Sequence, residues 1–294
     1  MTVKDRFLRR PIVCLRYKLH LFSGLVSGWR CDVSFGVLTL NLWNINEPLE
    51  PRYRAIAAGL RTMRPEIVCL QEVYRDRKSA RSQAELIAEC CGLTNYVEEN
   101  GLAILCSLPV IRSNSAALPQ FPPDPSRHVV WAEFLIKGRR LLVINTHLAY
   151  APEMVEERRQ QAQALLAAIR RQYPAPGGIA KIICGDFNDV ADSPAVRAIL
   201  ESDDGFRDVF AERHPNSPGF TYTPRNPYVE RSWTVDERID YVFASPNLEP
   251  KDCAVVFDGN NGLDFASDHF GVFCKLEFSR TTSQSRFNSN SSQE

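Results

Sequence analysis

Acidic, amide and histidine side chains recur along the sequence wherever an apolar run gives way to a loop. These residues are Asn41, Glu72, His147, Asp186, Asn188, Asp240, Asp268 and His269. An apolar run of this kind forms a buried strand, and a polar residue at its end is held by a rigid element at the edge of a sheet. The pattern therefore predicts one site assembled from segments that lie far apart in the sequence.

The oxygen-bearing members of this set indicate metal-assisted hydrolysis of a phosphate ester. Hard cations prefer oxygen ligands, so Asn41, Glu72 and Asp268 are the candidate ligands of Mg²⁺, with Mn²⁺ as the alternative. Asp186 could take or orient a proton of the attacking water. The leaving group would then depart without a serine or cysteine nucleophile.

The nitrogen-bearing members could stabilise charge on the phosphoryl oxygens. Asn188 and His147 can donate hydrogen bonds to such oxygens. An Asp–His pair such as Asp240 with His269 would fix the tautomer of the imidazole and keep it charged beside a phosphate. These four residues together with Asp186 make up the candidate catalytic set of five.

Each residue also has a purely structural interpretation. Glu72 could cap a helix, and residues 185–188 could form a plain turn. His147 could be a structural histidine, and Asp240 could pair with Arg238 at the surface. The same residue classes recur at five strand ends in a fixed order, and this recurrence favours the site.

Strand and helix patterns alternate between residues 35 and 278. Short runs rich in β-branched and aromatic residues predict strands at 36–42, 67–72, 103–107, 129–136, 141–146, 181–184, 239–244 and 271–278. Helices are expected at 52–63, at 153–172 after Pro152, and from Pro194 with Asp192 or Ser193 as its cap. Several strands follow one another without a helix, which a parallel sheet would require, so mixed sheets are expected.

Composition is that of an ordinary globular protein without a broadly basic surface. The 35 basic residues balance the 35 acidic ones, and 44% of residues are hydrophobic. Of nine cysteines, Cys69, Cys106, Cys184 and Cys274 sit in apolar runs and should be buried thiols, which indicates a reducing, cytoplasmic location. No run approaches the roughly 20 apolar residues of a membrane span, so no transmembrane segment is expected.

Three regions are expected along the chain. Residues 1–34, with seven Lys or Arg against two Asp, form a basic extension. It could be a targeting segment, a surface extension, or an addition from an upstream start codon. Residues 35–278 form the catalytic domain, expected to be a monomer, and the Ser- and Asn-rich residues 279–294 form a disordered tail.

Six motifs in order resemble the endonuclease/exonuclease/phosphatase superfamily, which includes deoxyribonucleases, neutral sphingomyelinases and inositol-polyphosphate phosphatases. They are LNLW (40–43), IVCLQEV (67–73), NTHL (145–148), GDFND (185–189), RIDYVF (238–243) and SDHFGV (267–272). The resemblance implies an α+β fold, a four-layer α/β/β/α sandwich of two mixed sheets flanked by helices. It also implies Mg²⁺ on Asn41 and Glu72, with Asp268 helping to position metal or water.

The same resemblance implies roles for the remaining motif residues. Asp186 would activate or orient the water, and Asn188 would stabilise the transition state. His147 would contact the phosphate or assist the leaving group, and Asp240 would orient His269. The implied activity is that of a metal-dependent phosphodiesterase.

The substrate is left open by these residues. Tyr222, Arg225 and Trp233 in the segment 219–233 could stack on bases or grip phosphates, or could pack this loop onto the domain. Arg158 and Arg159 favour nucleic acid, and the zero net charge opposes it. A lipid headgroup, a small phosphorylated metabolite and a non-enzymatic interaction module are the other candidates.

Overall fold

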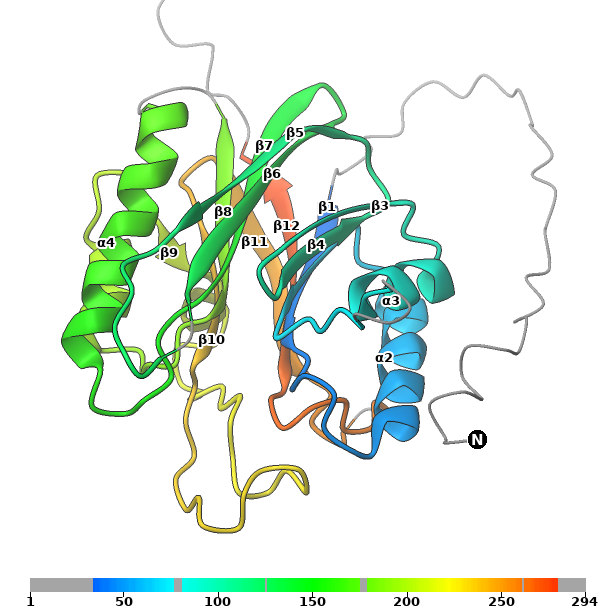
Figure 1. Ribbon diagram of the computed structural model, residues 1–294. Coiled ribbons are helices and arrows are strands. Elements are labelled where there is room, and N and C mark those ends of the chain that lie inside the picture. The colour runs from blue at the N-terminus through cyan, green and yellow to red at the C-terminus, as the bar shows by residue number, and fades with distance from the viewer. Residues whose placement is uncertain (1–33, 77–80, 125, 175–178, 261, 280–294) are drawn as a thin grey trace, which may run out of the picture. The chain divides into compact units, whose positions relative to one another are not determined.

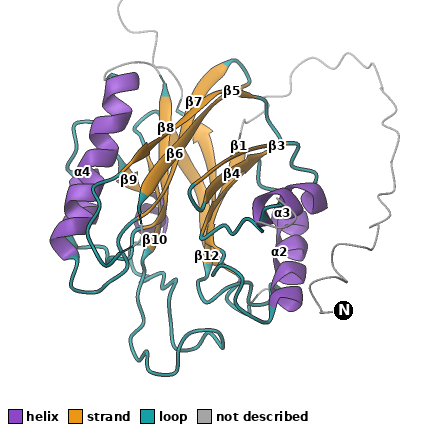
Figure 2. Ribbon diagram, in the orientation of Figure 1, coloured by secondary structure: helices purple, strands orange, loops and turns teal. Residues whose placement is uncertain are grey.

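The computed structural model describes residues 34–76, 81–124, 126–174, 179–260 and 262–279, which belong to the larger of two compact units, Val33–Glu294. Two mixed six-stranded sheets pack face to face, and helices cover their outer faces (Figure 1, Figure 2). The predicted α+β four-layer sandwich is therefore confirmed. The basic extension 1–34 and the tail 279–294 lie, apart from Ser34 and Ser279, outside the described residues.

The first sheet combines strands from the two ends of the domain. Its order is β11 (Leu248–Val256), β12 (Gly271–Phe278), β1 (Ser34–Asn41), β2 (Ile67–Gln71), β4 (Leu102–Cys106) and β3 (Asn95–Glu99). The neighbours β1 and β2 are parallel, and the other pairs are antiparallel. The sheet is thus mixed, as the strand spacing predicts.

The second sheet comes from the middle of the chain. Its order is β5 (Val110–Ala117), β6 (His128–Ile136), β7 (Arg139–His147), β8 (Ala180–Asp186), β10 (Asp240–Ala244) and β9 (Arg207–Asp208). Here β7 and β8 are parallel, because α4 (Val155–Gln172) crosses between them. The two carboxyl ends of this parallel pair therefore meet at one edge.

Each sheet has its own helical cover. α2 (Leu49–Met63) and α3 (Gln83–Cys91) pack apolar residues onto the outer face of the first sheet. α4 and α5 (Pro194–Leu200) do the same for the second, and a short α6 (Val209–Arg213) follows β9. Ser193 caps α5, as one of the two predicted caps, by accepting from Val196 N–H.

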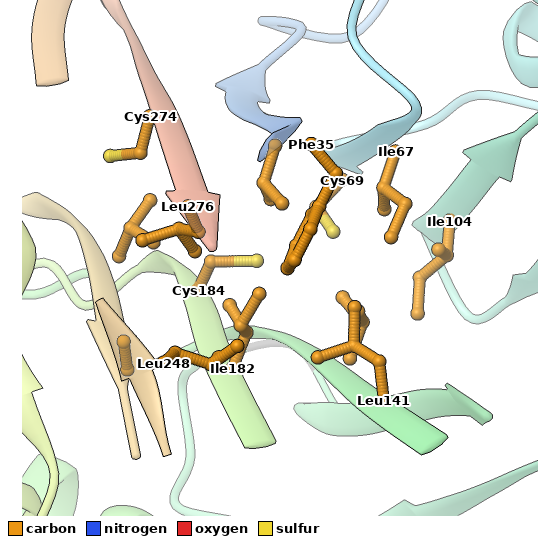
Figure 3. Packing of buried hydrophobic residues seen from close by; sticks show 14 of the residues in the cluster. Phe35, Ile67, Cys69, Ile104, Leu141, Ile182, Cys184, Leu248, Cys274 and Leu276 are labelled. Carbon is orange, nitrogen blue, oxygen red and sulfur yellow. The ribbon is translucent and has the colours of Figure 1, made fainter. Parts of the chain in front are cut away.

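The space between the sheets is filled by those side chains of each strand that point inward. Figure 3 shows this layer, in which Phe35, Ile104, Ile182 and Leu276 meet from both sheets. Successive strand residues alternate sides, so strands buried on both faces are apolar throughout. The four cysteines of the apolar runs are buried free thiols, as predicted.

One hydrogen-bonded amide pair crosses the apolar layer between the sheets. Gln71 Nε2 donates to Asn145 Oδ1 over 2.7 Å, and both residues are fully buried. Asn145 Nδ2 in turn donates to the carbonyl oxygens of Leu70 and Ala103, over 2.8 and 3.0 Å. The bond fixes β7 against β2 close to the site, because Gln71 directly precedes Glu72 and Asn145 lies two residues before His147.

Several elements escape the sequence patterns. β3, β5, β9, β11, α3 and α6 were not predicted. β5 and β11 are edge strands with exposed or interrupted patterns, and Pro250 lies at a bulge of β11, where an edge strand tolerates proline. α4 begins at Val155 and not beside Pro152, because Met154 N–H bonds to Ala151 O in a preceding turn.

Replacing Asn145 by alanine should lower the free energy of unfolding by about 2 to 3 kcal/mol, because Gln71 and two buried carbonyl groups lose their partner. Urea unfolding followed by circular dichroism measures the change. Asn114→Ala on the exposed face of β5 is the control and should change stability by less than about 0.5 kcal/mol. Equal stability of Asn145→Ala and wild type would contradict the role of the amide pair.

Candidate active site

The register of the second sheet brings three predicted residues to one point. Parallel pairing of β7 with β8 places His147 opposite Asp186, the last residue of each strand. Antiparallel pairing of β10 with β8 places Asp240 opposite Asp186 from the other side. A register shift of one residue would turn these side chains to the other face, so the strand pairing itself builds the site.

Asp186 is the residue on which the two halves of the site converge. Its Oδ2 accepts a hydrogen bond from Asn41 Nδ2 at 2.9 Å, across from the first sheet. The same oxygen lies 3.3 Å from His147 Nε2 and 3.7 Å from His269 Nε2. Its Oδ1 accepts from Asn188 N–H at 2.8 Å, which orients the loop after β8.

Asp240 and His269 form the predicted pair. His269 Nδ1 lies 2.9 Å from Asp240 Oδ2, and both residues are buried. Burial acts to lower the pKa of His269, but Asp240 and Asp186 outweigh it and raise this pKa well above its ordinary value. Arg238, the alternative partner of Asp240, pairs with Asp208 at 2.6 Å instead. The two carboxylates therefore favour the protonated form of His269.

His147 has the opposite protonation state. Burial, and then the charge of Arg127, lowers its pKa to about 3. His147 is therefore neutral, and its contact with Asp186 is one of polar atoms and not an ion pair. Arg127, which the sequence did not single out, is itself held by two bonds to Asp124 at 3.0 and 2.8 Å.

Carboxylates gather on the side of the site that belongs to the first sheet. Glu72 is half-buried in a left-handed conformation (φ 54°), and its Oε1 lies 3.3 Å from Asn41 Nδ2. Burial raises the pKa of Asp268 to about 6, and Glu72 and Asp186 add to the increase while His269 opposes it. This crowding of negative charge suits a divalent cation on Glu72 and Asp268, beside the amide of Asn41.

A second group of ligand atoms is less suited to a metal. Within the described residues, Asp186, Asp240 and His269 offer atoms that all lie within 4.8 Å of one another. Both ring nitrogens of His269, however, face carboxylates, and a protonated imidazole has no lone pair for a metal. This group therefore serves to hold the charge of His269.

Two of the three predicted substrate residues reach the site. The ring centroids of Tyr222 and His269 lie 4.9 Å apart, and those of Tyr222 and Trp233 lie 5.3 Å apart. Their loop, yellow in Figure 1, extends beyond the ends of the sheets. Arg225 instead lies 3.7 Å from Asp236 and lines a separate cavity with Phe220.

Other residues of the site were not predicted. Trp43 follows Asn41 closely, donates its backbone N–H to Asn41 Oδ1 at 2.9 Å, and stacks on Tyr228 at 5.7 Å. Its place in the LNLW motif was the available signal. Arg158, offered with Arg159 as a nucleic-acid contact, is 2% exposed and bonds to Asp189, so it cannot reach a ligand at the surface.

Comparison with known proteins identifies the family. The Endonuclease/Exonuclease/phosphatase family matches residues 38–269, a span that includes every predicted catalytic and metal-binding residue. The chain belongs to this family. As a member of the family it is a metal-dependent hydrolase of phosphate esters. Among curated proteins, none matches the sequence significantly.

Solved structures share the family fold at low identity. Truncated TDP2 of Caenorhabditis elegans is 21% identical with a TM-score of 0.69, covering 83% of this chain and 97% of its own. TDP2 of D. rerio, complexed with a single-strand DNA product, is 18% identical with a TM-score of 0.68, covering 84% and 100%. A mannosyl-6-phosphatase of Bacteroides thetaiotaomicron is 19% identical with a TM-score of 0.67, covering 83% and 100%.

Hydropathy adds one finding. Among the residues described, no helix combines the length and the apolar character needed to cross a bilayer.

Mg²⁺ should raise the thermal unfolding temperature of the protein more at about pH 7.5 than at about pH 5. The pKa of Asp268 is raised to about 6, so metal-free stability falls as pH rises through 6 and a bound cation restores it. Thermal unfolding with and without Mg²⁺ measures the shift, and Asp268→Asn should abolish its pH dependence. An equal shift at both pH values would remove Asp268 from the cation site.

Proposed function

We propose that this protein is a Mg²⁺-dependent phosphodiesterase whose proton-transfer groups are Asp186 and the Asp240–His269 pair. The observation that carries the proposal is the buried imidazole of His269, held by Asp240 at 2.9 Å and placed 3.7 Å from Asp186, so that both carboxylates favour its protonated form. A cationic donor and an anionic acceptor side by side can stabilise a phosphoryl group and orient a water in the same step. Mn²⁺ is the alternative ion.

Each residue of the site has a distinct task in this mechanism. Mg²⁺ on Glu72, Asp268 and Asn41 would neutralise phosphoryl charge. Asp186 orients the attacking water and receives its proton. His269, kept charged by Asp240, donates a hydrogen bond to a phosphoryl oxygen.

Neutral His147 and the amide of Asn188 complete the group that faces the phosphate. His147 can donate from Nε2 without adding charge, because its pKa of about 3 keeps it uncharged. Asn188 Nδ2 bonds to Leu148 O at 3.1 Å, which ties its position to the strand that carries His147. Both groups would assist departure of the leaving oxygen.

A single-stranded nucleic acid is the substrate class that we favour. Two aromatic pairs, Trp43 with Tyr228 and Tyr222 with Trp233, adjoin site residues, and the partly exposed rings of Tyr222, Tyr228 and Trp233 are of the kind on which bases stack. TDP2 of D. rerio, which shares the fold, is known with a single-strand DNA product.

A small phosphorylated metabolite is the second candidate. The arginines near the site already have partners: Arg158 bonds to Asp189, Arg159 to Glu156 and Arg127 to Asp124. Such a site grips a long polyanion weakly, and the chain has no net charge. A lipid headgroup has no supporting contact among the described residues. We further propose that the protein is a monomer in a reducing, cytoplasmic compartment.

Asp186→Asn and His269→Gln should each lower kcat at least about 100-fold, because each removes a group that handles the proton or the phosphoryl charge. Hydrolysis of bis-p-nitrophenyl phosphate with Mg²⁺ measures the loss. Asp252→Asn on the exposed part of β11 is the control and should retain full activity. Activity near the wild-type level in either variant would refute the assignment.

A substrate panel separates the two candidates. DNA, RNA, sphingomyelin and sugar phosphates are compared with Mg²⁺ and with EDTA. Cleavage of single-stranded nucleic acid, lost as salt rises and reduced by Trp233→Ala, is the expected result. Salt-insensitive cleavage of sugar phosphates alone would replace it with the metabolite phosphatase.

A further inference from the structure

Two buried arginines occupy the same position on the two main outer helices. Arg52 is the fourth residue of α2, and Arg158 is the fourth residue of α4. Their exposed fractions are 3% and 2%. Neither residue is a predicted catalytic or metal-binding group, and each points its guanidinium at the loops on its own side of the sandwich.

Arg52 joins two loops of the first sheet. It donates from Nε to Ala266 O at 3.1 Å, from Nη1 to Asn46 O, and from Nη2 to Leu42 O. Leu42 directly follows Asn41, and Ala266 lies two residues before Asp268. The guanidinium therefore ties the chain after one predicted metal ligand to the chain before another.

The loop that Arg52 holds has a strained backbone. Its residues Trp43 and Asn44 are both in the left-handed conformation, with φ of 53° and 50°, which is costly for non-glycine residues. The guanidinium also lies over the Trp43 ring, 5.0 Å from its centroid. The guanidinium therefore bonds to both ends of the strained turn after Asn41, at Leu42 O and at Asn46 O, while Gln83 Nε2 donates to Asn44 O between them at 2.8 Å.

Arg158 joins two loops of the second sheet. Its Nε donates to Asp189 Oδ2 at 2.9 Å. Its Nη1 donates to Ala151 O at 2.7 Å and to Ala149 O at 3.3 Å, and its Nη2 donates to Pro152 O at 3.1 Å. These loops follow His147 and Asn188 directly.

We propose that Arg52 and Arg158 are a matched pair of positioning residues with separate tasks. Arg52 sets the geometry of the cation end, through Asn41 and Asp268. Arg158 sets the geometry of the proton-transfer and phosphoryl end, through His147 and Asn188. Only a guanidinium supplies five donors in a rigid fork, so lysine cannot reproduce either arrangement.

The pair can be tested by substitution with lysine, which keeps the charge and removes the fork. Each variant has a control at an exposed arginine of the same helix: Arg54→Lys on α2 and Arg171→Lys on α4. Mn²⁺ alone is titrated by isothermal calorimetry. Cleavage of bis-p-nitrophenyl phosphate is then measured at saturating Mn²⁺.

The two variants should separate. Arg52→Lys should weaken Mn²⁺ binding about 10-fold with kcat at saturating metal little changed. Arg158→Lys should lower kcat about 10-fold with Mn²⁺ affinity unchanged. Both controls should match wild type. Equal losses of affinity and kcat in both variants, or no loss in either, would overturn the proposal.

Hydrogen exchange measured by mass spectrometry gives a readout that needs no activity. Arg52→Lys should speed exchange in peptides covering 42–46 and 266–269, and Arg158→Lys in peptides covering 148–152 and 186–190. A uniform increase across both sheets would indicate only global destabilisation and would overturn the proposal. If a lysine variant does not fold, Arg52→Gln and Asp189→Asn take its place with the same expected split.

The inference rests on the proposed function, yet the two fail separately. A wild-type protein that binds Mn²⁺ and cleaves no phosphate ester would sink the phosphodiesterase proposal. The Mn²⁺ affinity of Arg52→Lys and the exchange patterns of both variants would still decide the positioning roles.

Discussion

The carboxylate of Asp186 is the interaction on which the arrangement of the site depends. A buried carboxylate is costly unless it is hydrogen-bonded, and Asn41 from the opposite sheet and the N–H of Asn188 supply the bonds. The two sheets cannot slide relative to each other without breaking this contact. The Gln71–Asn145 bond crosses the same interface between β2 and β7, so hydrogen bonds join the two sheets at two separate places.

Two histidines beside one carboxylate end in opposite charge states for a clear electrostatic reason. His269 has the carboxylates of Asp240 and Asp186 on its two sides, which outweigh its burial. His147 has Arg127 and the charged His269 nearby, so burial and repulsion act together. The site thereby places side by side a cationic donor, a neutral donor and a cluster of carboxylates. The donors suit the phosphoryl oxygens, and the carboxylates suit the metal ion bound to them.

The sequence predicts the buried strands and the residues at their ends, since apolar runs followed by a lone polar residue leave a readable pattern. It does not predict β5 or β11, because an edge strand needs no apolar alternation. Arg52 also leaves no pattern: its partners are backbone carbonyl groups, one of them 214 residues away. The burial of Arg158 is equally unreadable from the sequence, because Arg159 beside it has the same charge and is partly exposed.

The place of β12 has a consequence for synthesis on the ribosome. β1 is the first described strand of the domain, and one of its two neighbours in the sheet is β12, the last described strand, with Ser34 paired to Glu277. At ordinary rates of translation, β1 keeps an unpaired edge for on the order of tens of seconds before β12 emerges. Unpaired edges recruit foreign strands, so nascent chains of this protein should depend on chaperones until His269 and β12 arrive together.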